Sequence, residues 1–358
     1  MNRLPLIVFI FQTFFLASPA LTETVEDVYF GSTAMIADTP VSYDTPVILK
    51  SFEDYNLFYG EIDDKDLTAK SVKGFFKNGG TKLYLINPQY ECTDDLYMAY
   101  DLALKMMKGL DVEFMSLPAA SFLSEYTVYK QIILNFIDIL EKNNAFGLID
   151  VPASLTYDES KLIQLAEIFS TQSAAMFAPW LSFDADDLFL PASAHIAGVM
   201  TRLDRAQGIF RPAAGPQAFV HGISSLNREF SNRDIAQLNE FGVNVLRYLS
   251  PLNGYFIWGA RHLSPSQYAP YISTYRFKTF LKNSIENSLS EINEESEVVI
   301  EDYLSHYWER GAFAGSQRYE SYFVRCGVYE LNSCEVGIAL QRPSEFIVFS
   351  VSKAEIYL

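Results

Sequence analysis

The sequence has 358 residues but only three cysteines, Cys92, Cys326 and Cys334. An odd and sparse count does not describe a disulfide scaffold, and none of the three has the spacing of a metal site. Cys326 and Cys334 could face each other across a hairpin, because residues 330–333 between them have turn chemistry. A structural disulfide there is not the expectation, and the cysteines point to no function.

Basic residues are also few: the chain has 27 lysines and arginines and 44 aspartates and glutamates. The formal net charge is therefore −17. Binding to a nucleic-acid backbone needs clustered basic residues that displace counterions. Attraction to an anionic membrane needs them as well. We therefore expect neither nucleic acid nor a membrane surface as a direct partner.

Motifs for catalysis are scarce. No two of the four histidines have the four-residue spacing, with a glutamate between them, that zinc-protease chemistry uses, and no G-x-S-x-G segment exposes a nucleophilic serine. In residues 74–82, glycine occupies the position where a phosphate loop has lysine, so a helix end and a turn are expected. Asp184, Asp186 and Asp187 lack the glycine and the terminal glutamate of a calcium loop. No metal or cofactor is therefore expected.

One enzymatic alternative remains open. Ser193 and His195 are two residues apart, which on a strand would place them on one face. A catalytic triad also needs an acid and an oxyanion hole, and such proximity is common by chance. In this alternative the chain is a secreted α/β hydrolase in which Ser193, His195 or Asp204 carries the chemistry.

A long hydrophobic run at the N-terminus bears on that alternative. Residues 4–17 are interrupted only by Gln12 and Thr13, and the small residues 18–20 that follow suit a signal peptidase. The run is short for a membrane span. The other interpretation is an extended arm, because residues 4–11 are rich in β-branched and aromatic side chains. A strand of that kind needs a neighbouring subunit to complete it.

The rest of the chain has the composition of a folded protein, with 49% hydrophobic and 20% charged residues, and its length suits two domains. Apolar runs alternate with segments of helical period, which predicts a layered α/β domain with a largely parallel sheet. The expected strands include 83–86, 112–116, 145–151 and 174–179, and the expected helices include 95–108, 128–143 and 159–169.

Beyond about residue 240 the pattern changes to an α+β ending. Helices are expected over 275–289 and 298–310, followed by strands over 322–325, 336–341 and 345–351. We therefore place a domain boundary near residue 245.

A set of segments between residues 45 and 350 resembles the phage tail sheath proteins. The longest, from Leu190 to Gly215, is similar to a block of that family almost position by position. The others are Asn78-Gly79-Gly80 with Leu83 to Ile86, Ile149 to Pro152, Ala178 to Leu181, Asn244 to Arg247, Ile257 to Leu263, Ala314-Gly315, Tyr322 to Cys326 and Arg342 to Ile347. The hydrophobic run replaces the family's usual N-terminal segment, and His262 stands where the family has threonine. In length and content the chain is most similar to sheaths of extracellular contractile injection systems.

The resemblance implies a structural protein and not an enzyme. Sheath subunits of this family form six-subunit rings that stack helically around an inner tube, and contraction drives the tube through a target envelope. The implied partners are further copies of the chain, the tube protein, baseplate and terminal cap proteins, and sheath paralogues. The implied location is a particle that assembles in the cytoplasm and then forms part of a phage tail or is released from the cell.

The resemblance also implies that neighbouring subunits exchange extended terminal strands. The candidate arms are residues 1–27 and 346–358, which flank an α/β sheath domain over 28–245 and a C-terminal sheath domain over 246–345. The side chains expected to enter a neighbouring sheet are Leu6, Val8, Ile10, Ile347, Phe349 and Val351.

A contact with the tube is an inference from charge. The predicted helix over 275–289 carries Arg276, Lys278 and Lys282 against Glu286, a local charge of +2 within a chain of −17. A solvated helix face would show the same pattern, so both interpretations stay open.

Overall fold

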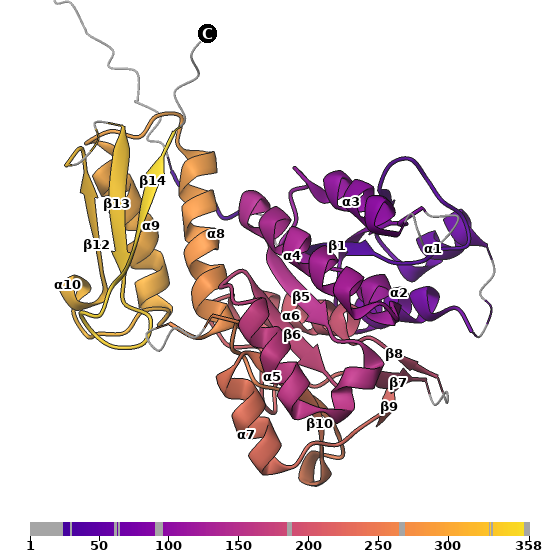
Figure 1. Ribbon diagram of the computed structural model, residues 1–358. Coiled ribbons are helices and arrows are strands. Elements are labelled where there is room, and N and C mark those ends of the chain that lie inside the picture. The colour runs from indigo at the N-terminus through magenta and orange to yellow at the C-terminus, as the bar shows by residue number, and fades with distance from the viewer. Residues whose placement is uncertain are drawn as a thin grey trace, which may run out of the picture.

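The computed structural model describes residues 24–28, 31–60, 63, 65–89, 96–184, 188–264, 269–328, 330 and 332–353. They form a large α/β body and a smaller C-terminal body that lie side by side (Figure 1). The arm candidates Leu6, Val8 and Ile10 lie outside the described residues, as do Asp186 and Asp187. Within the described ranges, no helix is long and apolar enough to cross a membrane.

The α/β body is organised around an eight-stranded sheet with the order β11-β10-β6-β5-β4-β1-β3-β2. The six inner strands are parallel, whereas the edge strands β2 and β11 are antiparallel to their neighbours. The largely parallel sheet predicted from the alternating pattern is therefore confirmed. The strands are β1 Ser32–Ile36, β2 Val47–Leu49, β3 Lys82–Ile86, β4 Phe114–Ser116, β5 Phe146–Asp150, β6 Ala174–Ala178, β10 Val243–Leu249 and β11 Gly254–Trp258.

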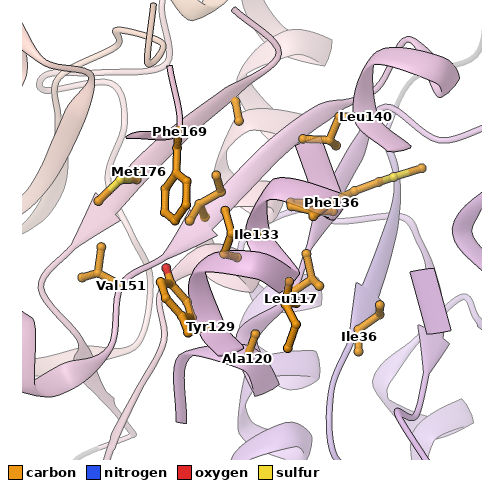
Figure 2. Close-up of a cluster of buried hydrophobic side chains, with 14 of the residues drawn as sticks. Ile36, Leu117, Ala120, Tyr129, Ile133, Phe136, Leu140, Val151, Phe169 and Met176 are labelled. Carbon is orange, nitrogen blue, oxygen red and sulfur yellow. The ribbon is translucent and has the colours of Figure 1, made fainter. Parts of the chain in front are cut away.

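Helices cover both faces of this sheet, and successive strand residues alternate between two cores. Ala34 and Ile36 face the core formed with α3, α4, α5 and α7, where Phe136 is fully buried (Figure 2). Met35 faces the opposite core, formed with α1, α2 and α6. The helices are α1 Phe52–Tyr59, α2 Leu67–Lys77, α3 Leu96–Met107, α4 Tyr126–Asn143, α5 Glu159–Ile168, α6 Ser193–Gln207 and α7 Asn232–Glu240.

Local caps explain where several of these helices begin. The Ser51 hydroxyl accepts a hydrogen bond from the Asp54 amide, and the Asp54 carboxylate accepts one from the Ser51 amide, which is a capping box at α1. Asp158 caps α5 through the Lys161 amide. In each helix the cap side chain accepts a hydrogen bond from a backbone amide of the first turn, which has no partner within the helix.

Short elements complete the α/β body. A three-stranded antiparallel sheet has the order β8-β7-β9 and packs beside α2 and α6 in the second core. Its strands are β7 Leu181–Phe183, β8 Phe189–Leu190 and β9 Ile223–Leu226, and the 3₁₀ helices of this body are η2 Pro118–Phe122, η3 Ala153–Tyr157 and η4 Ser250–Leu252.

The C-terminal body packs two helices against a three-stranded antiparallel sheet in the order β12-β13-β14. Figure 1 shows its first helix, α8, standing between the sheet and the α/β body. Phe277 and Leu304 are among the fully buried side chains of its core. The elements are α8 Ile272–Ser288, α9 Ser296–Glu309, α10 Arg318–Ser321, β12 Tyr322–Cys326, β13 Ser333–Ile338 and β14 Ile347–Ser352.

The division between the bodies follows the large sheet. The boundary expected near residue 245 falls within β10, and β11 pairs with β10 in the same sheet over Val245–Leu249. We therefore propose that the division lies between Trp258, where β11 ends, and Ile272, where α8 begins.

Cys326 and Cys334 form a disulfide, which the sparse cysteine count did not lead us to expect. The register of the β12–β13 hairpin places the two residues directly opposite each other. Cys334 also pairs with Val351 of β14 on its other side. The bond therefore crosses the first two strands of the C-terminal sheet.

Candidate functional site

The serine and histidine of the enzymatic alternative do not form a catalytic pair. Both lie on α6 and not on a strand, so a separation of two residues turns them to different sides of the helix. The Ser193 amide donates to Asp150 Oδ1 at 2.9 Å, which caps the helix N-terminus. Burial raises the pKa of Asp150 to about 7, although the bonds from Ser193 oppose this. Ser193 is therefore held in a helix start and is fully buried.

His195 is enclosed by apolar and backbone groups. Its ring packs at 4.9 Å from the Phe183 ring, and neither ring nitrogen has a hydrogen-bond partner in the described part of the chain. Burial lowers the pKa of His195 to about 3. A buried, neutral imidazole whose nitrogens bind no group in the described part of the chain gives no support to a general-base role.

Asp204, the third catalytic candidate, belongs to an interior ion-pair network. The Arg276 guanidinium approaches Asp204 Oδ2 to 2.5 Å through Nη2 and also binds Glu113. Its Cζ atom lies 4.4 Å from the centre of the Phe114 ring. Burial raises the pKa of Asp204, and the charge of Arg276 opposes the rise. The network joins α8 to α6 and to the residue before β4.

This placement corrects the expectation that Arg276 contacts the tube. Its side chain is 3% exposed, and both neighbouring carboxylates belong to the same chain. Although burial disfavours the charged guanidinium, Asp204 and Glu113 outweigh this and raise the pKa of Arg276. The positive charge of Arg276, which suggested a surface contact, therefore binds carboxylates in the interior of the same chain.

Lys278 and Lys282 are the members of the charged set that keep access to solvent. Lys278 is half-buried beside the Tyr275 ring, with Nζ 5.2 Å from the ring centre, and burial lowers the pKa of Lys278. The Lys282 ammonium lies 3.6 Å from Glu286 Oε1, and the Lys282 side chain is 37% exposed. These two lysines remain the candidates for a contact outside the chain.

The C-terminal arm candidates lie on β14, which pairs along its length with β13 of the same chain. Phe349 and Val351 point into the core of the C-terminal body, and Ile347 packs against its margin. β14 is an edge strand, so its outer side pairs with no further strand among the described residues. An edge of this kind can accept a strand from another chain.

The first described residues are bound to this same body. Glu26, Asp27 and Val28 hydrogen-bond side chains of α8 and α9, and Val25 and Val28 pack against the C-terminal core. The chain then enters the α/β body at β1. Residues 24–28, which precede the α/β body in the chain, are therefore anchored on the C-terminal body.

Sequence reasoning missed these anchoring residues. Tyr303 and Tyr307 have the i, i+4 spacing that places two side chains on one helix face, which was the available signal. Their partner Asp27 lies more than 270 residues away in the chain. No metal-binding group of three or more histidine, cysteine or acidic side chains occurs in the part of the chain that the structure describes.

Solved structures with a similar fold include sheath proteins. The chain matches the sheath in a structure titled as the contracted PVC sheath complex of an extracellular contractile injection system, with a TM-score of 0.71, 21% identity and 99% of each chain covered. The contracted helical sheath of the anti-feeding prophage matches with a TM-score of 0.69, 22% identity, and 99% of this chain and 100% of that chain covered. The sheath tail protein Lin1278 from Listeria innocua matches with a TM-score of 0.63, 9% identity, and 92% and 96% covered.

These matches confirm the predicted resemblance to tail sheath proteins at the level of the fold. They extend over both bodies of the chain and give the hydrolase alternative no support. Searches with protein-family models and among curated proteins returned no match.

Proposed function

We propose that the chain is the sheath subunit of a contractile injection particle. In this role it polymerises as stacked hexameric rings around an inner tube and contracts to drive the tube through a target envelope. The observation that carries the proposal is the match over 99% of both chains with a contractile sheath subunit, because it includes the C-terminal body as well as the α/β body. A shared α/β core alone would not distinguish functions, since such cores serve many.

The two ends of the described chain support this role. Residues 24–28 and the end of β14 both lie against α8, and the outer side of β14 pairs with no other strand in the part of the chain that the structure describes. Arms that leave from one body beside an open strand edge suit strand exchange between neighbouring copies. The proposed arm regions remain 1–27 and 346–358, with β14 acting both as a strand of its own sheet and as the place where a neighbour adds.

The proposed partners are further copies of the chain, the tube protein, and baseplate and cap proteins. Lys278 and Lys282 are the proposed tube contacts, since they are the basic side chains of the set that are open to solvent. The net charge of −17 opposes polymerisation, so local contacts must outweigh it and salt should promote assembly. We also propose assembly in the cytoplasm, followed by incorporation into a tail or a released particle.

Electron microscopy of the full-length chain, produced with its tube protein, tests the proposal. We expect striated tubes of helically stacked rings that contain this chain. Sedimentation should place most of the chain in the polymer at 150 mM salt, which shortens the Debye length to about 8 Å. A chain that remains a monodisperse monomer with its tube protein across a salt series would overturn the proposal.

A further inference from the structure

Residues 24–28 have no secondary structure of their own, yet they lie in contact with α8 along two turns. The Glu26 amide donates to Ser288 Oγ at 2.8 Å, and the Ser288 hydroxyl in turn donates to the Glu26 carbonyl at 3.2 Å. The Val28 amide donates to Ser284 Oγ at 3.2 Å. The two serines are one helical turn apart, so they bind alternate residues of the segment.

Asp27 binds the second helix of the same body. Its Oδ1 atom accepts hydrogen bonds from the Tyr303 hydroxyl at 2.9 Å and from the Tyr307 hydroxyl at 2.7 Å. Both tyrosines are buried, with 8% and 3% of their surface exposed. Burial and the Asp27 carboxylate raise the pKa values of both phenols, so they remain protonated donors at neutral pH. Asp27 is thus held by two donors that the core has already positioned.

The end of β14 uses the same part of α8. The Ser352 amide donates to Glu286 Oε1 at 3.1 Å. Glu286 lies two residues from both Ser284 and Ser288, so it projects from a different side of the helix. The last two turns of α8 therefore bind residues 24–28 on one side of the helix and the end of β14 on another.

We propose that Asp27, gripped by Tyr303 and Tyr307, is the positioning residue that fixes the root of the N-terminal arm on the C-terminal body. The inference rests on the proposed sheath function, because the arm positioned in this way would serve a neighbouring subunit. We call the contact of Asp27 with Tyr303 and Tyr307 the clamp. Because of the clamp, the arm starts beside the end of β14 and not at β1.

Loss of the clamp would move this starting point. Residues 24–28 pair with no strand, so the next fixed point in the described chain is Gly31, whose amide donates to Glu113 and whose carbonyl accepts from Thr81. About seven released residues, each spanning roughly 3.3 Å, would let the root move over about 23 Å. A longer free tether lowers the effective concentration of the arm at its docking edge.

The test compares full-length variants that remove the clamp but keep the core. Tyr303→Phe combined with Tyr307→Phe removes both donors and retains the rings, which pack 5.4 Å apart. Asp27→Leu removes the acceptor, and Asp27→Asn is the rescue variant, because an amide oxygen can still accept both bonds. Tyr97→Phe is the matched control, since Tyr97 is an exposed residue of α3 whose hydroxyl accepts from Asn135.

Two measurements are needed. Hydrogen exchange at the Glu26 and Val28 amides in the unassembled chain should accelerate at least tenfold in the tyrosine double variant and in Asp27→Leu. It should remain close to the wild-type rate in Asp27→Asn and Tyr97→Phe. The fraction of chain that sediments as sheath should fall at least tenfold in the first two variants and be retained in the other two.

Each outcome decides one part of the inference. Unchanged exchange in the clamp variants overturns the clamp. Faster exchange with normal sheath formation overturns the positioning role. Failure of the wild-type chain to form sheath overturns the proposed function and, with it, the positioning role. In that case the exchange rates still show whether the clamp exists.

Discussion

Arg276 of α8 and Asp204 of α6 form an ion pair with 2.5 Å between Nη2 and Oδ2, in the interior where the two bodies meet. Glu113 binds the same guanidinium and also accepts a hydrogen bond from the Gly31 amide at 3.1 Å. The Arg276 guanidinium therefore links α8 to α6 through Asp204, and to the residue before β4 of the main sheet through Glu113.

Replacement of Arg276 by methionine should destabilise the chain strongly. The substitution leaves the buried Asp204 and the partly buried Glu113 without their cation, and breaking a buried ion pair such as Arg276–Asp204 in this way costs about 3–5 kcal/mol. Urea denaturation of the unassembled chain measures the change. Arg205→Met is the control, because Arg205 is exposed on α6 and should change stability by less than about 0.5 kcal/mol. Equal midpoints for the two variants would show that Arg276 has no such structural role.

The buried Asp150 carboxylate should make the chain more stable in mild acid. The folded pKa is about 7 and the ordinary value is 3.8, so over this interval the folded state holds a proton that the unfolded state has lost. The stabilisation is fully present below the unfolded pKa and is lost as the pH rises through 7. Between pH 5 and pH 8 the change for this group is about 2 to 3 kcal/mol.

Asp150→Asn isolates this contribution, because the amide cannot ionise but can still accept from the Ser193 amide. We expect the free energy of unfolding of the wild-type chain, relative to the variant, to fall from pH 5 to pH 8. Taking the difference cancels other groups such as His195, whose pKa of about 3 acts in the opposite direction. Parallel pH profiles for the two proteins would contradict the assignment.

The architecture of the α/β body could be predicted because its signals are local. The caps at Ser51 and Asp158, and the alternation of strands and helices, are properties of short segments. The block that carried the resemblance coincides with a tight packing point. A Cβ atom on Gly198 of α6 would lie 2.3 Å from the Phe75 carbonyl oxygen of α2, so this helix pair can approach so closely only with glycine there.

The candidate site could not be predicted to the same degree, because its contacts join distant residues. Arg276 looks like a surface charge in its own helix, and its partners Asp204 and Glu113 lie 72 and 163 residues away. Ser193 and His195 would share one face only on a strand, and the surrounding run forms α6. Side-chain direction in such cases is decided by tertiary packing, which a local pattern does not contain.

The two solvent-accessible lysines of α8 should affect tube binding without affecting the fold. Lys278→Glu combined with Lys282→Glu changes the local charge by −4, which should weaken co-sedimentation with the tube protein, most strongly at low salt. Lys105→Glu combined with Lys161→Glu is the control, because it makes the same change at exposed ion-paired lysines of α3 and α5. Equal tube binding by both double variants would remove Lys278 and Lys282 from the proposed interface.

The disulfide should stabilise the C-terminal body under oxidising conditions. Cys326 and Cys334 are eight residues apart in sequence, and closing a loop of this size stabilises a protein by roughly 2–3 kcal/mol through the unfolded state. Cys326→Ser combined with Cys334→Ser should therefore lower the free energy of unfolding by about that amount in the absence of reductant. Excess dithiothreitol should bring the wild-type chain close to the variant, because both then lack the cross-link. A difference that survives full reduction would mean that the packing of the sulfur atoms, and not the bond, provides the stability, since Cys334 is fully buried beside Val351.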